Sequence, residues 1–138
     1  MPTAFEHLRK SNENRSAIEH LALGVPINPP PNAWLVTMYF YTALHLVEKK
    51  LAVKGLHSRR HAKRFEHIAG HLSEIDSVYL AMYNDSMKAR YGCDPIEDDL
   101  VREAKENLET ICSELGETLV IPEVVVIPTS DIDLSDAK

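Results

Sequence analysis

A segment in the middle of the chain concentrates side chains that bind anions and transfer protons. Residues 54–64 contain five Lys or Arg and no acidic residue, and four of the seven histidines lie in or near this segment: His57, His61, His67 and His71. Guanidinium groups bind phosphate through paired hydrogen bonds, and an imidazole with an unperturbed pKa of about 6.5 exchanges a proton near neutral pH. Because the whole chain carries a net charge of −6, the cluster predicts a local anion site rather than a surface that wraps duplex DNA.

Four of these residues are predicted to lie side by side on a helix over residues 58–72. Arg60, Arg64, His67 and His71 fall within about 60° of one another around the helix axis, beside its apolar face. Such a row can hold a phosphate while an imidazole acts as general acid or base. This is the minimum set for metal-independent RNA cleavage, in which the 2′-hydroxyl is the nucleophile. We therefore interpret these four as candidate catalytic residues.

Two other interpretations of the segment stay open. A run of charged residues often coats a solvated helix face without forming a site. Histidines one helical turn apart, as in His57 with His61 and His67 with His71, are also typical of metal ligands. No cysteine ligand or metalloprotease glutamate pattern accompanies these pairs. We therefore predict neither a metal site nor a cofactor.

Four more residues are predicted to bind an anion or RNA. Arg59 and Lys63 belong to the basic segment, and Arg90 and Tyr91 end the sequence SMKARY. An arginine next to a tyrosine can bind a phosphate and stack a base. The alternative is that these cations only complement the dipole at the end of a helix.

A polar stripe crosses the most apolar predicted helix, residues 33–54. Thr37, Tyr41, His45 and Glu48 share one of its faces. In one account Tyr41, His45 and Glu48 hydrogen-bond to one another and to neighbouring helices, as buried polar groups normally do. In the other, Glu48 orients an arginine or histidine from the third or fourth helix.

The elements that position these residues are predicted to be helices. Hydrophobic periodicity and breakers place them over residues 4–23, 33–54, 58–72, 73–91 and 94–119. The side chains predicted to cap them are Thr3 with Glu6, Asn32, Ser58 and Asp94.

The apolar positions of two helices predict which of their faces is buried. In the third helix, Ala62, Phe65, Ile68, Ala69 and Leu72 fall in one arc. The fifth helix has an apolar arc of about 120°, formed by Leu100, Val101, Ala104, Leu108, Ile111, Cys112, Leu115 and Leu119.

Composition and length are those of one soluble globular domain. The chain has 138 residues, of which 44% are hydrophobic and 26% charged. We expect an all-α fold, with an up-and-down bundle of four to five helices over residues 1–119 and an extended arm over residues 120–138, where two prolines bracket a β-branched run. Neither a disulfide scaffold, a signal peptide nor a membrane span is predicted, so we expect a cytoplasmic protein.

Three stretches together resemble the HEPN family, the higher eukaryotes and prokaryotes nucleotide-binding domain. They are AWLVTMYFYTALH at residues 33–45, LVEKKLAVKGLHSRRHAKR at 46–64 and SMKARY at 86–91. The similarity lies in the aromatic-rich second helix, the Gly-x-His-Ser junction and the late Ser-to-Arg-Tyr segment, and it extends over residues 4–119. The resemblance implies a helical bundle, usually a homodimer, that acts on or binds RNA or nucleotides.

The resemblance also implies two alternatives for function. Many members are toxin ribonucleases of toxin–antitoxin or antiviral systems, with an antitoxin as protein partner, and others have lost catalysis. Active members are similar in having an arginine followed, after four to six residues, by a histidine. Arg60 with His67 and Arg64 with His71 fit this spacing, but the family's motif usually lies nearer Arg90, and no histidine follows His71. The alternative to a ribonuclease is a non-catalytic dimerisation or protein-interaction module.

Overall fold

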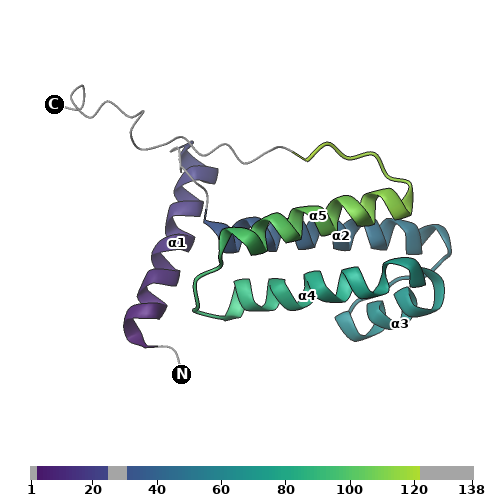
Figure 1. Ribbon diagram of the computed structural model, residues 1–138, viewed down its shortest axis with the longest axis horizontal. Coiled ribbons are helices and arrows are strands. Elements are labelled where there is room, and N and C mark those ends of the chain that lie inside the picture. Colours follow the sequence, from purple (N-terminus) through teal and green to yellow (C-terminus); the bar gives the residue numbers. More distant parts are fainter. Residues whose placement is uncertain (1–2, 25–30, 122–138) are drawn as a thin grey trace. The chain divides into compact units, whose positions relative to one another are not determined.

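The computed structural model describes residues 3–24 and 31–121 (Figure 1). The chain divides into two compact units. Helix α1 (Ala4–Leu23) belongs to one unit, and residues Asn32–Ile121 form the other. No strand occurs in the two described stretches, so the all-α prediction is confirmed there.

Helix α1 has the bounds that its terminal residues predict. The Thr3 hydroxyl accepts a hydrogen bond from the Glu6 amide, and the Glu6 carboxylate accepts one from the Thr3 amide, which completes a capping box. The helix ends at Gly24, which adopts a left-handed φ of 70° that suits glycine. The predicted helix over residues 4–23 is therefore confirmed.

The second unit is a helical bundle built around α2 (Asn32–Val53), which packs against both α4 (Asp76–Tyr91) and α5 (Asp98–Leu115) (Figure 1). Helix α2 is apolar on nearly all sides, as a central helix must be. The short helix α3 (His61–His71) and the 3₁₀ turn η1 (Ser73–Ile75) follow the turn at Gly55 and pack beside α4. Completely buried side chains in the core include Phe40, Val47, Leu51, Ile68, Ile75, Tyr79 and Ile111.

Three predicted helix caps are wrong. Asn32 does not cap α2: its side-chain amide donates instead to the Ile96 carbonyl at 2.9 Å and to an Asp98 carboxylate oxygen at 2.8 Å. Helix α5 begins at Asp98 rather than Asp94. The intervening segment stays non-helical, with Cys93 buried and Ile96 packed against the core. Tertiary contacts thus outweigh the local start signal.

The third wrong cap is Ser58, and the buried face of its helix also differs from the prediction. Helix α3 begins at His61, and its N-cap is Arg60, whose side chain makes no capping hydrogen bond. The Ser58 hydroxyl pairs with His67 instead. Ala62 and Ala69 are exposed, whereas Arg64 is buried beside Ile68. The predicted apolar arc is displaced because the bundle buries an arginine.

The fifth helix is shorter at its C-terminal end than predicted. Helix α5 ends at Leu115, before a left-handed Gly116, so it does not reach Leu119. Of the predicted arm, residues 120 and 121 are non-helical, and residues 122–138 lie outside the described residues. No helix in the described part of the chain has the length and apolarity needed to cross a membrane.

Candidate functional site

Two acceptors on the polar stripe of α2 each bind an arginine from another helix. A Glu48 carboxylate oxygen accepts a hydrogen bond from Arg64 Nε of α3 at 2.5 Å. About two helical turns earlier, the Tyr41 hydroxyl accepts a hydrogen bond from Arg90 Nη1 of α4 at 2.7 Å. The stripe therefore contacts neighbouring helices, and Glu48 does orient an arginine of the third helix. The Thr37 hydroxyl donates to the Ala33 carbonyl of its own helix, and His45 is exposed.

Arg64 is buried and has acceptors for all its nitrogens. Only 6% of the residue is exposed. Besides the ion pair with Glu48, Nη2 donates to the Ser58 carbonyl at 3.2 Å, and Nη1 lies 3.1 Å from His61 Nδ1. A buried guanidinium is tolerated when it is paired and fully hydrogen-bonded. Arg64 thus ties α2, the loop before α3 and α3 itself together.

The Tyr79 hydroxyl lies in the same buried region. Tyr79 is completely buried, and its hydroxyl makes no hydrogen bond of good geometry to the residues that the structure describes, although the Arg64 side chain lies beside it. Burial raises the pKa of Tyr79 to about 12, against the opposing effect of the Arg64 charge. The hydroxyl therefore stays protonated at neutral pH.

Among residues 3–24 and 31–121, the hydrogen-bond partners of Arg90 are all neutral. Its Nε and Nη2 contact the carbonyl and hydroxyl of Ser86 at 3.4 and 3.2 Å, and Nη2 also contacts the Met87 sulfur at 3.4 Å. Its guanidinium carbon lies 5.3 Å from the ring centre of Tyr41 and 5.1 Å from that of Tyr91. No carboxylate within residues 3–24 and 31–121 forms an ion pair with Arg90. Its positive charge is therefore not neutralised by this part of the protein.

His61, at the start of α3, lies between the two arginines. Its ring centre is 6.2 Å from that of Phe40 and 5.0 Å from that of Tyr83. The Arg90 guanidinium lies against the same Phe40 ring, at 5.8 Å. Burial lowers the pKa of His61, and the charges of Arg64 and then Arg90 lower it further. We call Tyr41, His61, Arg90 and Tyr91 the Arg90 surface.

The candidate catalytic residues occupy different environments. Arg60 and His71 are exposed at opposite ends of α3, about 16 Å apart along an axis that rises 1.5 Å per residue. Arg64 points inward to Glu48, and the His67 Nδ1 atom lies 2.8 Å from the Ser58 hydroxyl. The structure therefore brings Arg64 together with Glu48, and His67 together with Ser58, but it does not bring Arg60 together with His71.

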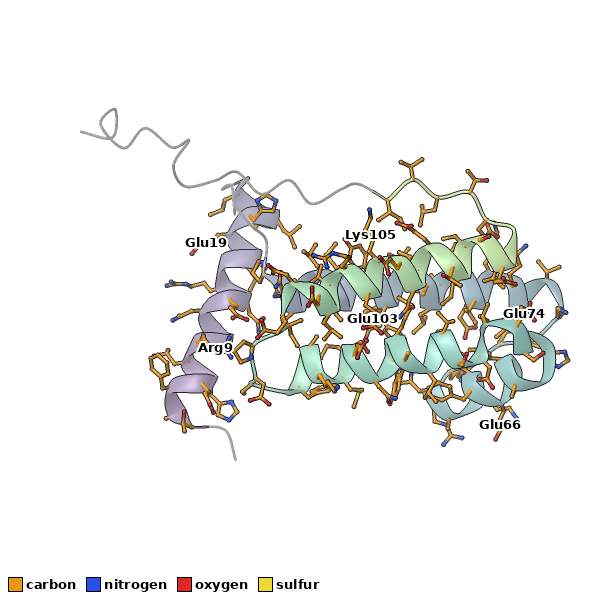
Figure 2. The ribbon with its side chains drawn as sticks, in the orientation of Figure 1. Arg9, Glu19, Glu66, Glu74, Glu103 and Lys105 are labelled. Carbon is orange, nitrogen blue, oxygen red and sulfur yellow. The ribbon has the colours of Figure 1, made fainter. Side chains whose placement is uncertain are left out.

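The remaining basic residues of the segment are on the surface. Arg59 is exposed. Lys63 pairs with Glu66 at 3.1 Å, and Figure 2 shows Glu66 on the outer side of α3. Within the described stretches, no group of three His, Cys, Asp or Glu side chains could hold a metal ion.

His61 is the residue of the Arg90 surface that the sequence prediction did not include. Its signal was available, because His61 precedes Arg64 by three residues on one helix, where side chains face each other. Ser86 and Arg90 show the same relation at a spacing of four. The spacing alone does not predict that His61 of α3 and Arg90 of α4 both lie against the Phe40 ring.

Comparison of the chain with protein-family models, curated proteins and solved structures finds no match.

Proposed function

We propose that the bundle is an RNA- or nucleotide-binding domain of HEPN type, which binds its ligand through the Arg90 surface. The observation that carries the proposal is the environment of Arg90: a half-buried guanidinium, fixed by neutral groups, with aromatic rings beside it and no carboxylate partner in the described residues. A phosphate oxygen supplies the negative charge that the described residues do not provide.

The aromatic rings favour a nucleotide over a simple anion. Tyr91 is 70% exposed and Tyr41 37% exposed, so unpaired bases have access to both rings. Stacking on tyrosine contributes to the binding of single-stranded nucleic acid and depends little on sequence. Arg59, Arg60 and Lys63 begin or precede α3, next to His61, and add positive charge to this end of the helix.

The more specific form of the proposal is that the domain cleaves RNA. In a metal-independent ribonuclease of a toxin–antitoxin or antiviral system, a histidine of α3 transfers the proton and an arginine stabilises the negative charge of the phosphorane-like transition state. We expect the double substitution of His67 and His71 by Ala to abolish cleavage of single-stranded RNA. Undiminished cleavage by this variant would remove the mechanism. Protein that binds but does not cleave RNA would be a non-catalytic member.

One observation favours a second candidate, a dimerisation or protein-interaction module. Leu80, Met87 and Tyr91 are exposed on α4 at spacings of seven and four residues, which is one face of a helix. Such a face could contact a second copy or an antitoxin-like protein. Sedimentation of the purified protein, alone and with RNA, separates self-association from nucleic-acid binding.

The binding proposal is tested by fluorescence anisotropy with a labelled single-stranded RNA. Arg90→Gln removes the charge while keeping a polar side chain, and Tyr91→Ala removes the most exposed ring. The matched control is Arg102→Gln on α5, an exposed arginine paired with Asp99 at 2.9 Å. We expect both variants of the Arg90 surface to bind more weakly and the control to bind normally. Equal binding by all four proteins would reject the proposal.

A further inference from the structure

The contact between Arg64 and His61 determines which imidazole nitrogen carries the proton. Arg64 Nη1 lies 3.1 Å from His61 Nδ1. A guanidinium group has donors and no acceptor, and it does not lose its proton in proteins. Nδ1 must therefore be the acceptor of this hydrogen bond. An imidazole that accepts at Nδ1 is neutral and has its proton on Nε2.

Arg64 is fixed firmly enough to impose this choice. It is buried, and Glu48 of α2 and the Ser58 carbonyl hold two more of its nitrogens. The charges that act on His61 are those of Arg64 on α3 and Arg90 on α4, and the nearest carboxylate in this network, Glu48 on α2, pairs with Arg64. Tyr83 of α4 and Phe40 of α2 contact its ring. Two cations against one carboxylate disfavour a third positive charge on the ring.

The second ring nitrogen of His61, Nε2, has no hydrogen-bond partner in the described part of the chain. It lies across the ring from Nδ1, and the residue is only partly buried. An N–H group in this position needs an acceptor, from water or from a ligand.

We infer that His61 is the neutral hydrogen-bond donor of the Arg90 surface: its Nε2–H donates to an oxygen of the phosphate that Arg90 binds, and Arg64 is the positioning residue that fixes this tautomer. The inference deepens the proposed function and depends on it. It also restricts the ligand, because a protonated Nε2 can donate but cannot accept. A phosphate, carbonyl or hydroxyl oxygen satisfies it, whereas an exocyclic amino group of a base, which only donates, does not.

The tautomer is measured without any ligand. Long-range ¹H–¹⁵N correlation spectra of protein labelled at histidine distinguish a neutral ring protonated at Nε2 from one protonated at Nδ1. At pH 7.5 we expect His61 to show only the Nε2-protonated form. Removing the arginine together with its counter-ion, in Glu48→Gln/Arg64→Met, should give His61 the mixed pattern of an unconstrained histidine. A Nδ1-protonated His61 in the unmodified protein would overturn the inference.

The role as a donor is measured by RNA binding. We expect His61→Ala to weaken binding of the labelled single-stranded RNA about tenfold, the usual loss for one hydrogen bond to a charged group. His61→Gln should retain most of the affinity, because its side-chain amide can place an N–H near the position of Nε2. The control is His20→Ala, an exposed histidine of α1.

The outcomes separate this inference from the proposed function. If Arg90→Gln weakens binding and His61→Ala does not, the inference fails and the function stands. If neither substitution has an effect, the function fails. If His61→Ala and His61→Gln lose affinity equally, the ring acts through shape or stacking, and the donor role is rejected.

Discussion

Arg64 and Arg90 are both held by α2, but the protein treats their charges differently. Arg64 is buried against Glu48, with a further acceptor from the backbone and one from an imidazole. Arg90 bonds to Tyr41 and Ser86, is flanked by aromatic rings, and has no ion pair in the described stretches. Because Arg64 has its counter-ion within the bundle, we expect its charge to contribute to stability. Because Arg90 is held in place without a counter-ion in the described stretches, we expect its charge to be available to a ligand.

The largest effect expected from this contrast is on stability. Arg64→Met leaves the Glu48 carboxylate without its partner in a mostly buried position, so we expect the free energy of unfolding in urea to fall by about 3 kcal/mol, the lower end for a broken buried ion pair. Glu48→Gln/Arg64→Met removes both charges and should recover part of this loss. An Arg64→Met protein as stable as the unmodified one would show that Arg64 is not a structural tie.

The opposite result is expected for Arg90. Because no described carboxylate loses its partner in Arg90→Gln, the free energy of unfolding should change by less than about 1 kcal/mol. RNA binding should fall about tenfold, which corresponds to about 1.4 kcal/mol, and the dependence of affinity on salt should become shallower by about one counter-ion. A loss of stability as large as that of Arg64→Met would mean that the two arginines have the same role.

How far the sequence predicts this contrast depends on the distance between the interacting residues. Local signals were sufficient for the helical content, for the capping box at Thr3 and for the polar face of α2 that contains Tyr41 and Glu48. They failed where a distant group competes for a side chain. Asn32 was expected to cap its own helix, but Ile96 and Asp98, more than 60 residues away, take its amide.

Contacts with distant groups also explain why the four candidate catalytic residues of α3 do not form the single surface that was predicted. Helical periodicity places Arg60, Arg64, His67 and His71 near one another in projection, but it contains no information on what lies opposite. Glu48 turns Arg64 inward, and Ser58, expected as a helix cap, contacts His67. Periodicity thus identified the residue types of the candidate site. Their division into a structural pair and a ligand-facing surface required the tertiary structure.

A smaller effect on stability is expected from Tyr79, which lies beside Arg64. The buried Tyr79 hydroxyl makes no hydrogen bond of good geometry to the described residues, so Tyr79→Phe removes an unsatisfied group and should raise the free energy of unfolding at pH 7 by up to about 1 kcal/mol. The folded-state pKa of about 12 lies above the usual 10.0. The unfolded chain therefore loses the Tyr79 proton first, so the free energy of unfolding falls as the pH rises from 10 toward 12. This alkaline loss, followed by urea unfolding, should be absent in the Phe variant. If it persists, another group causes it.

The smallest effect is expected from His61, and it has the opposite dependence on pH. Its folded-state pKa lies below the unfolded value of 6.5, so the unfolded chain binds the proton more readily. The stability contributed by the neutral ring is complete above pH 6.5 and is lost as the pH falls through 6.5 toward the folded-state pKa. In His61→Gln the free energy of unfolding should therefore vary less between pH 7.5 and 5. Arg64 contributes more to this shift than Arg90 does, so Arg90→Gln should reduce the pH dependence only slightly. If Arg90→Gln removed the pH dependence completely, the Arg90 charge would control the protonation of His61 in place of the buried Arg64–Glu48 pair. The distinction between a structural arginine and a ligand-binding arginine would then be wrong.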